Sequence, residues 1–313
     1  MRAAVVKRYI KDHIKKIITK RYCVRINKLF DTKRYYVIRR RAPWAGFYAN
    51  YLYVAGHIVY ALKKGYIPVV DMENYPTLYN EPVEFKGTNN AWEYYFDQPG
   101  GVTVQEAIKS GNYILSDYST MREYIPYRDG NSYFDIDWKK AGPLVDVLHK
   151  YMIPKAEIMQ EVEAFWQTNC AGKKVLGVHY RGTDKKVHVA NHFLSASLAN
   201  YIKCVEKNLE DANPDVILLC TDDQEAISLF SERYPDKIVF SSAFRAEEGD
   251  VEGIHLMKNV KRKNHNYLLG KEVIIDVMLL SKCHYFVFSH SNVATTVMFL
   301  NNQKFDNTYF VED

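Results

Sequence analysis

The second half of the sequence alternates short apolar runs with longer stretches of helical spacing. Strand-length apolar runs lie at 174–180, 216–220, 238–240 and 285–288. Helix-length stretches lie near 195–210, 223–234, 267–282 and 292–301. Strands that alternate with helices predict a parallel sheet with right-handed crossovers, so the fold class is α/β. No GxGxxG fingerprint follows these strands, which argues against a typical dinucleotide enzyme.

Polar residues follow each predicted strand of this half. The residues just after parallel strands meet at one edge of the sheet, where open α/β sheets bind ligands. The clusters are His179 to Asp184, Thr221 to Asp223, Ser241 with Ser242, and Ser289 to Asn292. Four polar clusters at one rim predict a binding site.

The chemistry of this rim indicates a phosphate-bearing ligand. Arg181 suits a bidentate phosphate contact and Lys185 suits a point-charge contact. The turn from Ser289 to Asn292 opens a predicted helix, whose free N–H groups and dipole form a second anion site. A nucleotide-sugar diphosphate needs such groups, because charge builds on its β-phosphate as the glycosyl bond breaks. The alternative for Arg181 is an interdomain salt bridge.

Three aspartates have two interpretations each. Asp276 lies in a helix that is apolar nearly all round, so its carboxylate needs donors: either the N–H groups of a guanine or an internal arginine. Asp222 and Asp223 follow a strand directly. They either approach a divalent metal or cap the next helix through Asp222.

The first half contains one clear βαβ unit, with a strand at 35–39, a helix over 47–64 and a strand at 67–71. An amphipathic helix over 155–168 closes this half. We therefore predict three parts: a basic segment over 1–34, an α/β domain over 35–170 and a Rossmann-like domain over 171–313. The order of elements in 104–153 stays open.

Positive charge is concentrated at the start of the chain. Residues 1–41 carry 15 Lys and Arg against 2 Asp, so this segment is +13 and the remainder is −8. Apolar residues at positions 6, 10, 14, 17 and 18 recur at helical spacing among the lysines. This pattern is typical of a helix on an anionic membrane surface. A helix packed on its own domain, with a solvated basic face, fits equally. No nucleic-acid module is recognisable, so we expect no nucleic-acid partner.

Composition sets the expected location. Five cysteines are scattered without metal-binding spacing, which fits a reducing compartment. No apolar run is long enough to span a membrane, and the N-terminal segment lacks the apolar core of a signal peptide. We expect a cytoplasmic protein, with peripheral attachment to the membrane's cytoplasmic face as the open alternative.

Several motifs of the second half, taken in order, resemble the α1,6-fucosyltransferase family, which includes the bacterial nodulation fucosyltransferases. The resemblance covers roughly 146–313. The motifs are the loop from His179 to Lys185, Tyr201, Thr221-Asp222-Asp223, Gly253-Ile254-His255, Asp276, and the turn from Ser289 to Val293. A weaker match places Trp92 and Glu93 in a Trp-Glu-x-x-Phe segment similar to one of the family. It could line an acceptor cleft or form a hydrophobic plug under a long loop.

The resemblance implies a GT-B-like fold of two Rossmann-like domains facing a cleft, GDP-fucose as donor, inversion at the sugar C1, and neither metal nor cofactor. The domain over 171–313 would bind the donor and the domain over 35–170 the acceptor. His179 would touch the nucleoside, Arg181 the β-phosphate, Ser291 or Asn292 the phosphates, and Asp276 the guanine. The remaining donor-binding residues are Tyr201, Asp222, Asp223 and Ser289. The acceptor side would include Trp92, Glu93 and His255.

Two departures from the family concern the chemistry directly. Gly182 stands where the signature has a second arginine. The family's catalytic glutamate is missing, and alternative alignments put Val189 or His188 there. We predict His188 as the general base, with His192 and Asp184 as substitutes, because an unperturbed histidine titrates near pH ~6.5. Arg181 and Lys185 complete the catalytic set.

These observations predict an inverting, metal-independent glycosyltransferase that moves L-fucose from GDP-fucose to a glycan hydroxyl, in polysaccharide biosynthesis. Its partners would be a nucleotide sugar, a carbohydrate acceptor and, through residues 1–22, an anionic membrane. The alternatives are a transferase for another nucleotide sugar and a non-catalytic nucleotide- or carbohydrate-binding module.

Overall fold

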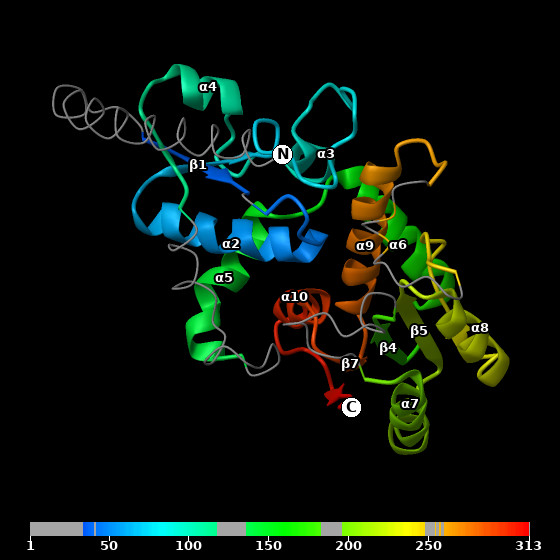
Figure 1. The fold of residues 1–313 in the computed structure, drawn as a ribbon. Coiled ribbons are helices and arrows are strands. Elements are labelled where there is room, and N and C mark those ends of the chain that lie inside the picture. Colours follow the sequence, from blue (N-terminus) through cyan, green and yellow to red (C-terminus); the bar gives the residue numbers. More distant parts are fainter. Residues whose placement is uncertain are drawn as a thin grey trace.

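Two parallel sheets organise the computed structural model (Figure 1), which describes residues 34–40, 42–117, 136–182, 196–247, 254, 257 and 260–312. The N-terminal sheet has the order β2-β1-β3. Its strands are β1 (Tyr35–Arg39), β2 (Ile67–Asp71) and β3 (Tyr113–Leu115). The predicted βαβ unit is confirmed, with α2 (Phe47–Lys63) between β1 and β2.

The C-terminal sheet has the order β6-β5-β4-β7-β8, and every pair in it is parallel. Its strands are β4 (Val175–Tyr180), β5 (Val216–Thr221), β6 (Ile238–Val239), β7 (Tyr285–Phe288) and β8 (Asn307–Phe310). The predicted parallel sheet is therefore confirmed. The edge strand β8 was not predicted, because its four residues are exposed or half-buried and carry no apolar run.

Helices join the strands of the C-terminal sheet. They are α7 (Leu198–Ala212), α8 (Gln224–Arg233), α9 (His265–Leu280) and α10 (Asn292–Asn301). Side-chain oxygens of Ser197, Asp223 and Ser291 accept backbone N–H bonds and so begin α7, α8 and α10. The alternative that Asp222 caps α8 was wrong, since Asp223 occupies the cap position.

The other helices belong to the first half of the chain. They are α3 (Ala91–Tyr95), α4 (Val104–Lys109), α5 (Trp138–Tyr151) and α6 (Ala156–Asn169). Helix α6 matches the predicted closing helix. Helix α5 was not predicted as an element, and Pro143 inside it weakens its helical signal.

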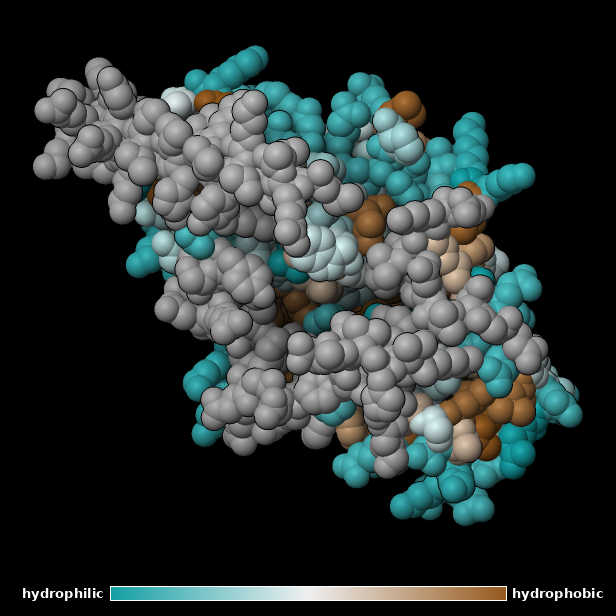
Figure 2. Space-filling view, viewed as in Figure 1, coloured by the Kyte–Doolittle hydropathy of each residue, from teal (hydrophilic) through white to brown (hydrophobic). Residues whose placement is uncertain are grey.

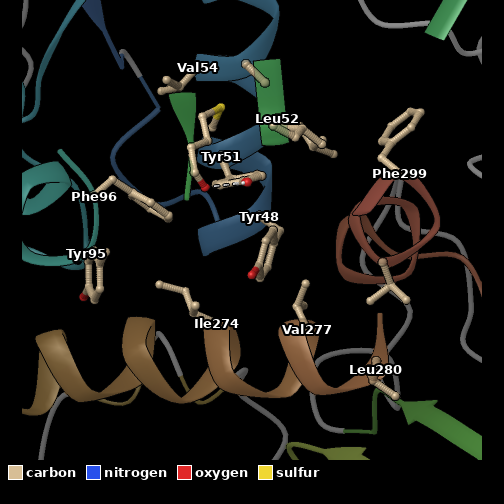
Figure 3. Close-up of a cluster of buried hydrophobic side chains, with 14 of the residues drawn as sticks. Tyr48, Tyr51, Leu52, Val54, Tyr95, Phe96, Ile274, Val277, Leu280 and Phe299 are labelled. Atoms are coloured by element: carbon tan, nitrogen blue, oxygen red, sulfur yellow. Dashed lines mark hydrogen bonds between the residues drawn. The ribbon is translucent and has the colours of Figure 1, made fainter. Parts of the chain in front are cut away.

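One hydrophobic core joins the two halves. Tyr48 and Tyr51 of α2 lie opposite Ile274 and Val277 of α9, and Phe299 of α10 lies at the side of the same cluster (Figure 3). Helix α9 packs against the helices α3, α6 and α10 and also against the strands β4 and β5. This packing against both helices and strands explains why α9 is apolar nearly all round.

A hollow with both apolar and polar side chains at its bottom lies between the halves (Figure 2). None of the helices in the described parts of the chain is long and apolar enough to cross a bilayer.

Candidate functional site

Three neighbouring strands of the C-terminal sheet end at the same level. His179 of β4 pairs in register with Cys220 of β5 and with Phe288 of β7. The residues after these strands therefore meet at one rim, as the sequence predicted. Arg181 and Gly182 follow β4, Asp222 follows β5, and Ser289 follows β7.

Gly182 fits tightly against the residues that follow β5. Its backbone N–H donates to Oδ1 of Asp222 at 2.9 Å. A Cβ atom at position 182 would lie 2.7 Å from the Cβ of Asp223, closer than side-chain carbons approach each other. A glycine is therefore required in this arrangement, and the arginine of the family signature does not fit at this position.

The backbone around the two aspartates also holds the loop after β6. Ala246 N–H donates to the Asp222 carbonyl at 2.9 Å, and Gln224 N–H donates to the Ala246 carbonyl at 3.1 Å. These contacts fix the loops after β4, β5 and β6 to one another. Among the residues that the structure describes, no group of three or more His, Cys, Asp or Glu could hold a metal ion.

Arg181 lies where the two halves of the chain meet. It is half-buried, and its positive charge acts on Tyr79, which belongs to the N-terminal half. Burial raises the pKa of Tyr79, while the backbone N–H of Phe47 and the charge of Arg181 act in the opposite direction. Tyr79 therefore stays protonated, with its hydroxyl near both the start of α2 and Arg181.

Asp276 is buried in α9 with a hydroxyl as its nearest partner. Ser241 Oγ donates to its Oδ1 at 2.7 Å. Burial raises the pKa of Asp276 to about 6, and the Ser241 bond and the charge of Arg245 moderate that rise. Arg245 donates to the carbonyl oxygens of Ala243 and Ser241. None of the cationic side chains that the structure describes is in direct contact with this carboxylate.

His179 and the start of α10 lie side by side at the rim. His179 is 8% exposed, and its Nδ1 lies 3.4 Å from Ser291 Oγ. The same Ser291 oxygen accepts the Ala294 N–H at 2.9 Å, so it begins α10 and faces His179. Tyr201 is fully buried and donates its hydroxyl proton to the His179 carbonyl at 2.9 Å. Ser289 is buried beside Tyr201, and Asn292 is the first residue of α10.

The family model described as alpha-(1,6)-fucosyltransferase N- and catalytic domains matches residues 143–305, which is more than half of the chain. The chain belongs to this family. The matched range contains β4 to β7 and therefore every described residue of the predicted donor site.

A curated relative of this α1,6-fucosyltransferase family member is Nodulation protein Z of Sinorhizobium fredii (strain NBRC 101917 / NGR234). The two are 31% identical over 102 residues, which cover 30% of this chain and 31% of that protein. The match thus spans about a third of the relative's length.

Solved structures show the same fold. The NodZ alpha-1,6-fucosyltransferase soaked with GDP-fucose is similar with a TM-score of 0.53 and 18% identity, over 86% of this chain and 93% of that chain. A mutant of Arabidopsis thaliana FUT1 in complex with GDP gives a TM-score of 0.52 and 11% identity, over 90% of this chain and 72% of that chain. The expected GT-B-like α/β fold is thereby confirmed.

Two of the residues predicted for the acceptor side, Trp92 and Glu93, lie inside the N-terminal half. Trp92 is 2% exposed, and its Nε1 donates to the Asp97 carbonyl at 3.1 Å. Glu93 accepts hydrogen bonds from Thr88 Oγ1 at 2.8 Å and Gln98 Nε2 at 2.7 Å, and so organises its own loop. The cavity beside Trp92 measures about 10 Å³, which is too small for a sugar ring.

Five residues that were predicted to act in catalysis or to bind the acceptor lie outside the described part of the chain. They are Asp184, Lys185, His188, His192 and His255. Tyr79 and Arg245 were not singled out from the sequence. Both lie in loops, so only the folded chain brings Tyr79 near Arg181 and Arg245 near Asp276.

Proposed function

We propose that the protein is an inverting, metal-independent fucosyltransferase that moves L-fucose from GDP-fucose to a glycan hydroxyl. The observation that carries the proposal is the position of Arg181, which follows β4 at the common rim and acts on Tyr79 across the boundary of the two halves. Family membership and the buried carboxylate of Asp276 support the choice of donor. The NodZ structure soaked with GDP-fucose supports the same donor by similarity.

In the proposed reaction, a base removes the proton of the acceptor hydroxyl as its oxygen attacks C1 of fucose. The bond from C1 to the β-phosphate oxygen breaks on the opposite face, and GDP leaves with the bonding electrons. Arg181 stabilises the charge on the departing phosphate, together with Lys185 and the N–H groups at the start of α10. His188 is the proposed base, with His192 and Asp184 as substitutes.

The proposed guanine contact uses Asp276. Guanine presents two adjacent N–H donors on one edge, which match the two oxygens of a carboxylate. Ser241 donates to one of these oxygens and orients the group. His179, Ser289, Ser291 and Asn292 would surround the nucleoside and phosphates, whereas the contacts of Tyr201, Asp222 and Asp223 support roles in holding the loops.

The test is a transfer assay with GDP-fucose and a panel of glycans, read by mass and by the anomeric configuration of the product. The proposal predicts a fucosylated product of inverted configuration. Thermal shifts with GDP, UDP, CDP and dTDP provide the second measurement, and GDP should stabilise most. A preference for UDP would favour the alternative of another nucleotide sugar. GDP binding without hydrolysis or transfer would favour a non-catalytic module.

We further propose that residues 35–170 form the acceptor side and 171–313 the donor side, and that the basic segment over 1–34 attaches the enzyme to an anionic membrane on its cytoplasmic face. The high density of lysine and arginine in that segment supports the attachment. Deletion of residues 1–22 should abolish sedimentation with anionic liposomes. Unchanged sedimentation would end the membrane proposal.

A further inference from the structure

Trp44 is the most exposed of the four tryptophans. It follows β1 in the loop that leads into α2, and it is 67% exposed. Trp92 is buried, and Trp138 and Trp166 are half-buried. An indole that is exposed to this degree presents a large, flat apolar surface that a ligand can cover.

The loop that carries Trp44 is fixed on both sides. The Pro43 carbonyl accepts the Leu78 N–H at 3.1 Å, and the Ala45 N–H donates to the Ala42 carbonyl at 3.2 Å. Asn50 Nδ2 donates to the Ala45 carbonyl at 3.2 Å. The indole is therefore held on a defined turn, so a ligand that stacks on it loses little of the binding energy to ordering the loop.

The loop lies at the carboxyl edge of the N-terminal sheet, where strands β1 and β2 end in parallel. It leads directly into α2, whose first residue is Phe47. The rings of Phe47 and Tyr79 pack edge to face, with their centroids 5.0 Å apart and their planes at 90°. The positive charge of Arg181 acts to lower the pKa of Tyr79. Phe47 also touches α9, because a Cβ on Gly270 would lie 2.9 Å from its ring.

Polar side chains border the same loop. Arg40 Nε donates to Asn50 Oδ1 at 2.7 Å, and its guanidinium lies 4.5 Å above the ring of Tyr53. An apolar platform next to ordered hydrogen-bonding groups suits a sugar ring, which has an apolar C–H face and a rim of hydroxyls.

We propose that Trp44 is an acceptor-binding residue on which a pyranose ring of the glycan stacks. The inference rests on the proposed function, because it assigns the acceptor to the side of the cleft opposite Arg181. It replaces the buried Trp92 with an exposed tryptophan on the same half of the chain.

The direct test is tryptophan fluorescence with maltotetraose, lactose and N-acetyllactosamine as probes. A stacking glycan should shift the emission to shorter wavelength and protect the exposed indole from acrylamide quenching. Both effects should vanish in W44F, while saturation-transfer NMR shows that W44F, which keeps an aromatic ring, still binds the glycan. In W44A the dissociation constant should rise at least tenfold. Val83→Ala is the control, because Val83 is 73% exposed on a different loop and should bind like the unmodified chain.

The kinetic arm separates this inference from the proposed function. The ratio of fucose transfer to donor hydrolysis should fall at least tenfold in W44A and stay unchanged in V83A. Absence of any turnover of GDP-fucose by the unmodified chain would count against the proposed function, while the binding arm would still report on Trp44. Equal glycan binding by W44A and the unmodified chain, or no protection of the indole by any probe, would overturn the assignment.

Discussion

Protonation of Asp276 should set the pH dependence of GDP binding. Burial raises its pKa from 3.8 to about 6. The proposed guanine contact needs the ionised carboxylate, which accepts both N–H bonds. At about pH 8 the group is almost fully ionised, whereas at about pH 5 only about one tenth is ionised. The affinity for GDP should therefore fall about tenfold, or about 1.4 kcal/mol, across this range.

The raised pKa of Asp276 makes the stability of the free chain fall with rising pH, whereas its affinity for GDP rises. The folded chain holds the Asp276 proton more tightly than the unfolded chain, so the free energy of unfolding should fall as the pH rises from about 4 to about 6. Binding of GDP by the ionised form should compensate for this loss above that range.

Isothermal titration of GDP between about pH 5 and about pH 8 measures the effect. Asp276→Asn is the matched variant, since it keeps the shape and removes the titration. Its affinity should be low, and its pH profile should show only the change that comes from the GDP phosphate. If D276N keeps the full affinity and the same profile as the unmodified chain, Asp276 does not bind guanine.

Three further outcomes follow from the contacts at the rim. Gly182→Ala should lower the melting temperature and reduce the free energy of unfolding by about 1–3 kcal/mol, because the new Cβ would lie 2.7 Å from the Cβ of Asp223. An unchanged melting curve would show that the loop has room for the methyl group. Asp223→Ala should remove the cap of α8 and lower the free energy of unfolding, measured by chemical denaturation, by about 1 kcal/mol. Asp223→Ser should largely restore it. Equal stability of both variants and the unmodified chain would contradict the capping role. EDTA should leave fucose transfer unchanged if the family resemblance holds for the mechanism, and a loss of activity that Mg²⁺ or Mn²⁺ restores would refute metal independence.

Most of the C-terminal sheet could be predicted from the sequence because its strands are buried on both faces. β4, β5 and β7 are fully buried and appear as continuous apolar runs. The elements that were not predicted have weaker patterns for identifiable reasons. β8 is a four-residue edge strand, and α5 contains a proline.

The candidate site divides in the same way. Residues directly after buried strands, such as Arg181 and Asp222, could be placed because topology alone brings strand ends together. Asp276 stood out because a carboxylate in an apolar helix needs a partner. Tyr79 and Arg245 could not be found, since their positions depend on where long loops pack. The exposure of Trp44 and the burial of Trp92 likewise depend on tertiary packing, which no local pattern encodes.

The central claim is that Arg181 holds the diphosphate as the fucosyl bond breaks. Its most direct test is the rate of GDP-fucose turnover by Arg181→Ala and Arg181→Lys at saturating donor. Loss of charge stabilisation should lower the rate of R181A by about 10² to 10³, with R181K intermediate because a lysine supplies charge without the bidentate contact. Turnover by R181A at the rate of the unmodified chain would contradict the account.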